Sequence, residues 1–429
     1  MLPIQKNFDK SFFAILSLPA TAMGFALSVQ IAALSWILNT KFGFDLHEIG
    51  IVWAAGPLAG IIGQVIIGLV SDGVWFWGGR RRPFILIGGI IAALMLLALP
   101  NIDVIGSFLG VEEFLGVAIA VALSLDLAIN ISFNPTRAII ADVTTEGPTR
   151  TKGYTWMQTV SGFFGVIAYL IGAFVSNYVL IYMGAGLVFI FSIIPTLFIT
   201  EPRLLNEDES GKQKAGSKTN MPQFLKICVA HAFTWLGVQT MFVYSFAYIK
   251  EVIMGFETTA TLSDAQNNNI GLITGIAFAV LNTVGFLLPA LVLEPITKKI
   301  GRVKTHMLCI ATMAIGYALI IFFGTSETAF YLFMIVVGVG WAAVVSLPFA
   351  IMSETVDQSR MGLYMGLFNL SVVIPQLGAS SLGGYIDGQA DKTTIYVISA
   401  IALGISSVLW LMVKESKTGG GKLQASGGH

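Results

Sequence analysis

Apolar residues in this chain gather in long runs, and short polar or charged segments separate these runs. Twelve runs have the length of a helix that crosses a membrane. They fall at residues 11–38, 49–72, 83–100, 112–140, 153–176, 179–199, 223–249, 269–293, 305–324, 327–352, 361–386 and 393–413. The first run is longer than the apolar part of a secretory signal, so we interpret it as the first membrane helix. The pattern predicts an all-α membrane protein with twelve transmembrane helices.

The longest polar segment divides these helices into six and six. We therefore expect an N-terminal six-helix bundle over residues 1–200 and a C-terminal six-helix bundle over 223–416. A cytoplasmic linker over 201–222 would join them. Residues 417–429 are rich in Gly and Ser and predict a flexible tail.

The two predicted halves repeat each other in two places. The basic segment 79–82 after the second helix resembles segment 298–302 after the eighth. Segment 134–142 at the end of the fourth helix, with Pro and an acidic residue, resembles segment 347–354 at the end of the tenth. Repeated six-helix halves are typical of transporters that rock two bundles around a central site. The fold class that we predict is therefore a pair of pseudo-repeated six-helix bundles.

Composition excludes several classes of protein. Of 429 residues, 55% are hydrophobic and only 11% are charged, and the formal net charge is zero. Soluble proteins carry about 25% charged residues, and nucleic-acid binders need a basic surface. The sequence contains no zinc-protease, Walker or nucleophile-elbow motif. We expect a membrane protein that is not an enzyme, binds no nucleic acid, needs no cofactor and functions as a monomer.

Basic residues predict the orientation in the membrane. With twelve helices both termini lie on one side, and 20 of the 24 Lys and Arg residues fall on that side. Only Lys41, Lys250 and Lys392 fall on the other side, and Arg137 lies at a helix end. Because basic loops stay in the cytoplasm, we expect a cell inner-membrane protein with both termini cytoplasmic.

A carboxylic acid lies in the middle of the fourth predicted helix. An ionised Asp126 at that depth would cost at least ~2.5 kcal/mol. Asn130 and Arg137 fall on the same helix face, which we expect to point inward, and Arg137 lies ~16 Å along the axis, too far for a direct ion pair. A buried carboxyl without a cation partner can take up and release a proton. We interpret Asp126 as a proton site, with a structural carboxyl bonded to a neighbouring helix as the alternative.

Charged residues also gather near the cytoplasmic helix ends. Arg137 and Asp142 lie at the end of the fourth helix, and Asp72 precedes the basic segment that includes Arg80. One hypothesis is a charge network that stabilises one state of the rocking cycle. The alternative is that the basic side chains extend to the interface.

Amides and an aromatic ring recur at membrane depth. His231, Trp235 and Gln239 follow one helix face, and Asn369 and Gln376, seven residues apart, share another. An aromatic ring flanked by amides suits a sugar, whose apolar face stacks while its hydroxyls form hydrogen bonds. Polar contacts between helices are the alternative for each residue, and His231 is more easily explained by packing. The candidate substrate-binding residues are Gln30, Gln64, Asn130, Trp235, Gln239, Asn369 and Gln376.

Four segments together resemble a known family. They are residues 56–85, with the pattern G-P-x-x-G-x-x-x-Q-x-x-x-G-x-x-S-D followed by G-R-R-R-P-F-I, and residues 125–142, 346–353 and 362–376. This combination resembles the plant sucrose/proton symporters and their relatives. That group belongs to the glycoside–pentoside–hexuronide:cation symporters of the major facilitator superfamily.

The resemblance implies a proton-coupled symporter for a disaccharide such as sucrose or maltose, working by alternating access. It implies that Asp126 carries the proton, that Arg137 matches the functional arginine of the family's fourth helix, and that Asp72 and Arg80 match its loop motif. The partners would be a small sugar, protons and the lipid bilayer. Segment 244–250 lacks the acidic pair that the plant proteins have there, so their range of substrates does not carry over.

Three other functions stay open at this point. Coupling to Na⁺ would replace the proton, as in some relatives of the family. An exporter of apolar compounds would fit the fold but not the amides at membrane depth. A membrane sensor would bind a sugar without moving it.

Overall fold

The computed structural model describes residues 8–60, 74–111, 113–144, 148–201, 219–258, 260–353, 355–356 and 361–415. Two candidate site residues, Gln64 and Asp72, lie outside this described part. So do most of the predicted linker and the predicted tail.

The first half of the chain folds into helices whose limits follow the apolar runs. These helices are α2 (Lys10–Thr40), α3 (Leu46–Trp53), α5 (Arg82–Ala98), η1 (Leu99–Asn101), α6 (Ile102–Leu109), α7 (Phe114–Val143), α8 (Pro148–Phe174) and α9 (Asn177–Phe198).

The second half contains two π-helical turns, η2 (Ile249–Ile253) and η3 (Pro289–Leu293). Its other helices are α10 (Met221–Tyr248), α11 (Asp264–Leu288), α12 (Glu294–Ile300), α13 (Arg302–Phe323), α14 (Glu327–Ser353), α15 (Met361–Ser380), α16 (Gly383–Asp387) and α17 (Thr394–Trp410).

Nine helices among the described residues are long and apolar enough to cross a membrane. The other three predicted spans correspond to α15, to the shorter apolar helix α17, and to the segment that begins with α3. That last segment is described only up to residue 60. The prediction of an all-α membrane protein is confirmed.

Polar residues just before the apolar runs fix where several helices begin. The side chains of Asp9, Ser176 and Asn220 each accept a hydrogen bond from a backbone N–H in the first turn that follows. Asp45 and Ser263 each form a reciprocal capping box with the residue three positions later. These bonds satisfy N–H groups that have no partner within the helix.

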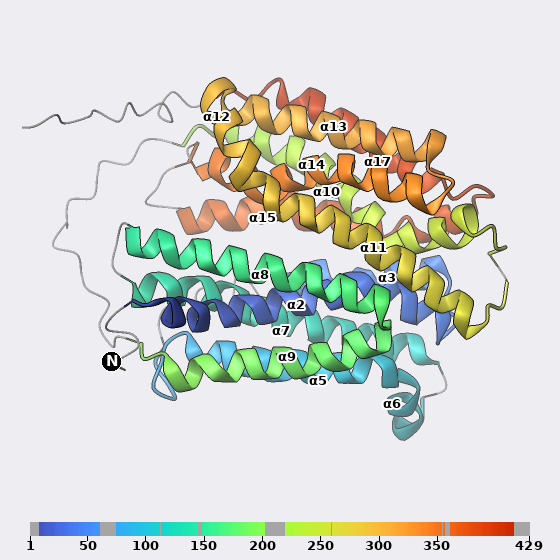
Figure 1. The fold of residues 1–429 in the computed structure, drawn as a ribbon, viewed down its shortest axis with the longest axis horizontal. Helices are drawn as coiled ribbons and strands as arrows, with labels where there is room; N and C mark the ends of the chain where they lie inside the picture. The colour runs from blue at the N-terminus through green and yellow to red at the C-terminus, as the bar shows by residue number, and fades with distance from the viewer. Residues whose placement is uncertain are drawn as a thin grey trace, which may run out of the picture.

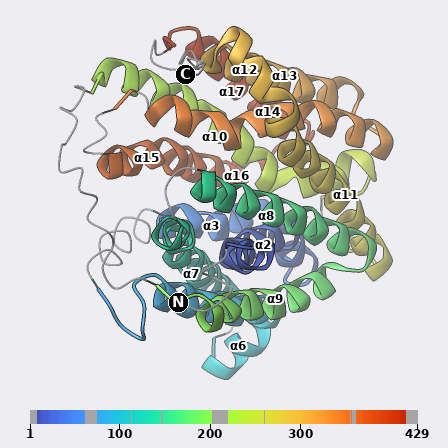
Figure 2. The ribbon, with the colours of Figure 1, turned by 60° about the vertical axis from the view of Figure 1, so that its left-hand side comes forward.

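The two halves lie side by side as two layers of roughly parallel helices. In Figure 1 the first half, blue to green, forms the lower layer, and the second half, yellow-green to red, forms the upper one. Seen from the side, α2 runs through the middle of the first half, with α3, α7, α8 and α9 around it (Figure 2). We name the end where α2 begins and α17 ends the terminal end, and the opposite end the far end.

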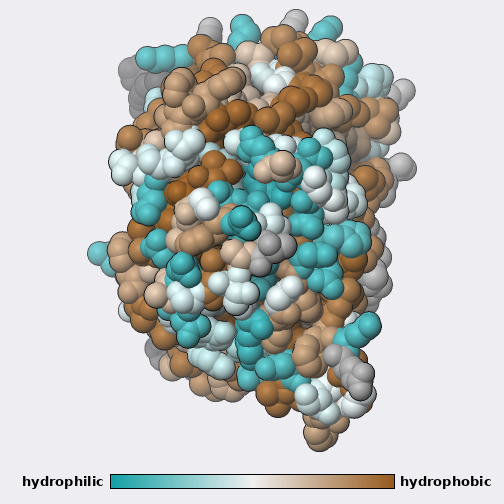
Figure 3. All heavy atoms as spheres, turned by 90° about the vertical axis from the view of Figure 1, so that its right-hand side faces the viewer, coloured by the Kyte–Doolittle hydropathy of each residue, from teal (hydrophilic) through white to brown (hydrophobic). Residues whose placement is uncertain are grey.

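The halves contact each other closely at the far end. The hydroxyl of Ser35 on α2 donates to the carbonyl of Val243 at 3.0 Å, and the indole N–H of Trp36 donates to the carbonyl of Asn267 at 2.7 Å. Gly50 on α3 lies so close to the carbonyl of Ser380 that a Cβ there would overlap it. Figure 3 shows this face filled by side chains, with polar residues across its middle and apolar residues at its rim.

The clusters of buried apolar residues also differ between the far end and the terminal end. One large cluster contains residues of both halves, from Ala22 to Leu403. Two further clusters lie towards the terminal end, and each belongs to one half: Phe12 to Ile199 in the first, Phe224 to Val413 in the second. Among the described residues, the core is therefore continuous between the halves through the middle and far end but divided at the terminal end.

Candidate functional site

Asp126 lies in the middle of α7, and its side chain is buried at 6% exposure. Its Oδ2 accepts a hydrogen bond of 2.9 Å from Nε2 of Gln30 on α2. Gly56 packs against the same carboxyl, since a Cβ at that position would lie 3.1 Å from Oδ2. Within the part of the chain that the structure describes, no Lys, Arg or His forms an ion pair with this carboxyl.

Gln30 can serve both protonation states of this acid. Its amide N–H₂ donates to an ionised carboxylate, and its carbonyl oxygen can accept from a protonated one after a rotation of the amide. An ion partner would instead hold the acid in its ionised form. The pair of Asp126 and Gln30 therefore suits a carboxyl that gains and loses a proton.

The other polar residues of α7 have different surroundings. The side chain of Asn130 donates to the backbone carbonyl of Asp126 at 2.8 Å. Arg137 is exposed, and its guanidinium carbon lies 4.2 Å from the centre of the Phe133 ring. We predicted that the face of this helix that carries Asp126, Asn130 and Arg137 points inward. In the structure Asp126 is buried in the middle of α7, whereas Arg137, nearer the end of the helix, is exposed.

A buried ion pair joins α5 to the end of α7. Nε of Arg81 lies 3.0 Å from Oδ2 of Asp142, and the two side chains are only 9% and 11% exposed. The sequence analysis placed Asp142 in a charge network with Arg80, whereas the structure gives this contact to the next residue. Asp72, the other predicted member, lies outside the described residues.

Glu201, which the sequence analysis did not single out, caps the start of α5. Its carboxylate accepts from the backbone N–H groups of Arg80, Arg81 and Arg82 at 2.8, 2.8 and 2.7 Å. Glu415 does the same at α13, accepting from Arg302 and Val303 at 2.9 Å each. A carboxylate at a helix N-terminus is stabilising, and the signal for it was an acidic residue two positions after the end of the sixth and twelfth apolar runs.

Replacing Glu201 with Ala should therefore destabilise the start of α5, where the N–H groups of residues 80–82 donate to its carboxylate. The loss of a charged cap costs about 1–2 kcal/mol, since the helix N–H groups then lose their acceptor. We expect a lower apparent Tm in detergent for Glu201→Ala and a smaller loss for Glu201→Gln. An exposed acid without a capping role, Glu257, supplies the control: Glu257→Ala should leave Tm unchanged, and an equal loss in both would contradict the capping role.

Four polar or aromatic residues of the second half lie in two hydrogen-bonded pairs. Nε2 of Gln376 on α15 donates to Oε1 of Gln239 on α10 at 3.2 Å. The indole N–H of Trp235 donates to Nε2 of His231 at 2.9 Å, and the buried His231 ring stacks on Phe368. His231 thus has the packing role that the sequence favoured. Asn369, on the same helix as Gln376, is half-buried.

Two residues that the sequence analysis missed extend the pair of Trp235 and His231. Trp341 on α14 meets Trp235 edge to face, with ring centres 6.2 Å apart. Its indole N–H donates to Oδ1 of Asn282 on α11 at 3.2 Å. Trp235, Trp341 and Asn282 are all half-buried, so parts of two indoles and an amide are accessible. Spacing of four or seven residues within a helix marked the predicted residues, and these two come from other helices.

Comparisons with known proteins agree with this architecture. The sequence model described as Major Facilitator Superfamily matches residues 16–379 and again residues 262–428. Sucrose transport protein SUT5 of Oryza sativa subsp. indica is 25% identical, covering 95% of this chain and 88% of that protein. Sucrose transport protein SUT1 of Oryza sativa subsp. japonica is 24% identical, covering 96% of this chain and 89% of that protein.

Solved structures share the fold. A variant of the nucleoside transporter NupG superposes with a TM-score of 0.71 at 14% identity, covering 94% of this chain and 100% of that one. The inward open conformation of the xylose transporter XylE from E. coli superposes with a TM-score of 0.69 at 13% identity, covering 95% and 97%. These relatives are transporters, which agrees with the expectation that the chain is not an enzyme. The chain is a multi-pass membrane protein that belongs to the major facilitator superfamily and resembles the sucrose transport proteins.

Proposed function

We propose that this protein is a proton-coupled symporter of a disaccharide or glucoside. The observation that carries the proposal is the buried carboxyl of Asp126, which accepts a hydrogen bond from the neutral amide of Gln30 and forms no ion pair with a cation of the described residues. Similarity to sucrose transport proteins over nearly the whole chain supports the sugar. The indoles of Trp235 and Trp341 offer faces on which a sugar ring stacks, and the nearby amides offer hydrogen-bond partners for hydroxyls.

The division of the apolar core indicates which conformation of a transport cycle the structure represents. Because the halves share a core at the far end and have separate cores at the terminal end, this conformation closes the far end. If the basic terminal end is cytoplasmic, as the distribution of Lys and Arg favours, the structure is an inward-facing state. Sugar and proton would then enter together from outside, and both would leave towards the cytoplasm after the far end closes.

Uptake into proteoliposomes tests this function. The purified protein is supplied with labelled sucrose, maltose and a monosaccharide, with an inward pH gradient, an inward Na⁺ gradient or neither. We expect accumulation of a disaccharide with the pH gradient only. Accumulation with Na⁺ alone would favour the sodium-coupled alternative. Binding of sugar without counterflow would favour a sensor and contradict transport.

Replacing Trp341 with Ala should weaken sugar binding. A stacked aromatic ring contributes about 0.5–1.5 kcal/mol beyond its buried area, so the KM of uptake should rise about two- to tenfold, with a smaller rise for Trp341→Phe. Trp77, which is 69% exposed in a loop, supplies the matched control. An unchanged KM in Trp341→Ala, or an equal change in Trp77→Ala, would contradict a stacking role.

A further inference from the structure

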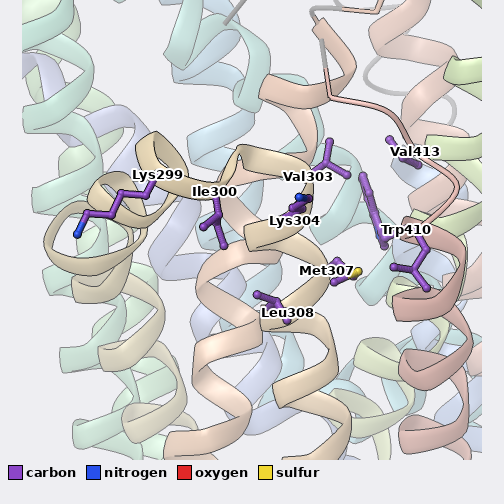
Figure 4. A pocket seen from close by; sticks show the side chains of 9 residues that line it. Lys299, Ile300, Val303, Lys304, Met307, Leu308, Trp410 and Val413 are labelled. Atoms are coloured by element: carbon purple, nitrogen blue, oxygen red, sulfur yellow. The ribbon is translucent and has the colours of Figure 1, made fainter. Parts of the chain in front are cut away.

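A groove lies at the terminal end of the second half, between α12, α13 and α17. Its volume is about 560 Å³, within the range of about 300–1,000 Å³ that is usual for small-molecule sites. Figure 4 shows Met307 and Leu308 of α13 on one side, with Trp410 and Val413 at the end of α17 opposite. The helices α13 and α17 lie on the outer side of the second half, away from the first half (Figure 1).

The floor of this groove is apolar, and it opens on an apolar surface. Trp410 and Val413 are buried, while the neighbouring Leu308 and Leu411 are 50% and 68% exposed. In a multi-pass membrane protein, an outer surface with leucines exposed to this degree faces lipid chains. An acyl chain can therefore enter the groove from the bilayer without crossing a polar barrier.

The mouth of the groove carries positive charge. Lys299 and Lys304 line it, and both are exposed. In Figure 4 Lys304 lies over the centre of the groove, whereas the ammonium of Lys299 extends away from its edge and can return on its flexible stem. The nearby carboxylate of Glu415 accepts from the N–H groups at the start of α13, so it is already engaged with that helix end.

We propose that this groove binds an anionic phospholipid, with an acyl chain along Met307, Leu308 and Trp410 and the phosphate between Lys299 and Lys304. We infer this occupant because the groove combines an apolar floor with a positively charged mouth. A zwitterionic lipid would bring the cation of its headgroup next to the two ammonium groups, and a free anion would leave the apolar floor uncovered. Basic pockets between helices at the cytoplasmic side of a membrane are suited to anionic headgroups. This inference requires the membrane fold but not the proposed sugar or coupling ion.

Trp410 provides a direct readout. The full chain is placed in nanodiscs that contain either brominated phosphatidylglycerol or brominated phosphatidylcholine at the same mole fraction, and tryptophan fluorescence is recorded. The part of the signal that Trp410→Phe removes belongs to the groove. We expect stronger quenching of that part by the anionic lipid than by the neutral one. Each Lys near an anionic surface contributes about fivefold, so K299Q/K304Q should weaken this preference about 25-fold.

Matched variants separate this site from a general attraction of anionic lipid. The pair Lys10 and Lys226 lies at the same end but does not line the groove, so K10Q/K226Q should keep the preference, as should K299R/K304R. Quenching by the neutral lipid checks that each variant is folded. Equal quenching of the Trp410 signal by both lipids, a preference that K10Q/K226Q loses as much as K299Q/K304Q does, or total quenching that Trp410→Phe leaves unchanged would each overturn the proposal.

Discussion

Replacing Asp126 with Asn should abolish gradient-driven accumulation of sugar while exchange of sugar across the membrane continues. An amide cannot carry a proton, so the variant retains the shape of the site and its contact with Gln30 but loses the coupling. With one proton per sugar, a pH gradient of one unit supports about tenfold accumulation, because one pH unit corresponds to about 1.4 kcal/mol. We expect this ratio in the wild type and a ratio of about one in Asp126→Asn. Both are measured by labelled uptake and by counterflow in the same proteoliposomes.

An acid outside the site provides the control for this result. Asp103 forms an exposed ion pair with Lys41 at 3.0 Å, and such pairs contribute little to stability. Asp103→Asn should accumulate sugar as the wild type does. Accumulation in Asp126→Asn would contradict its role as the proton carrier. If the variant lost exchange as well as accumulation, the structural-carboxyl alternative would be favoured instead.

Replacing Gly50 with Ala should disfavour closure of the far end. The added Cβ would overlap the backbone carbonyl of Ser380, which cannot move aside as a flexible side chain could. Overpacking of this kind costs about 1–3 kcal/mol, which shifts a two-state equilibrium about 5- to 150-fold. We expect a loss of transport rate of this order. The distance between spin labels at Lys41→Cys and Asp264→Cys, on opposite halves, should lengthen.

Gly404 is the matched control for this substitution. A Cβ at Gly404 would meet no atom within 4 Å, so Gly404→Ala adds the same methyl group to a helix without an overlap. The label pair is measured with Cys228 and Cys309 replaced by Ser. If Gly50→Ala and Gly404→Ala gave the same distance and the same rate, the close approach of α3 to α16 and α15 would have no part in the transport cycle.

The helices of this fold could be predicted from the sequence because hydropathy is a local signal. A run of about 20 apolar residues determines a membrane helix without knowledge of its neighbours. The capping residues refined several limits, as for Asp9 at the start of α2 and Ser263 at the start of α11. The extension of α5 into η1 and α6 was missed, since the expected run ended at residue 100.

The burial of Asp126 could also be predicted, from its depth in one helix, but its partner could not. Gln30 lies 96 positions earlier, and which two faces of α2 and α7 meet depends on how the helices rotate and pack. For the same reason, the contacts of Trp341 and Asn282 could not be predicted from the sequence. Each comes from a helix with no pattern of its own, and they join the group around Trp235 only through tertiary contacts.

The side-chain directions of Arg80, Arg81 and Arg82 could not be predicted from the sequence. Three consecutive arginines are equivalent in a sequence pattern, yet only one points at Asp142. The turn before them, with Trp77 and Gly78 at positive φ, sets the direction in which each side chain leaves the backbone. Arg81 thereby reaches Asp142 at 3.0 Å, and the backbone N–H groups of its neighbours face Glu201. Loop geometry of this kind is not encoded in hydropathy.

Proton movement that accompanies sugar movement tests the central claim most directly. Proteoliposomes are prepared with equal pH and equal Na⁺ on both sides and a pH-sensitive dye in the lumen, and a disaccharide is added outside. A symporter predicts acidification of the lumen that follows sugar entry and is absent in Asp126→Asn. Sugar entry at constant lumenal pH would contradict proton coupling through this buried carboxyl.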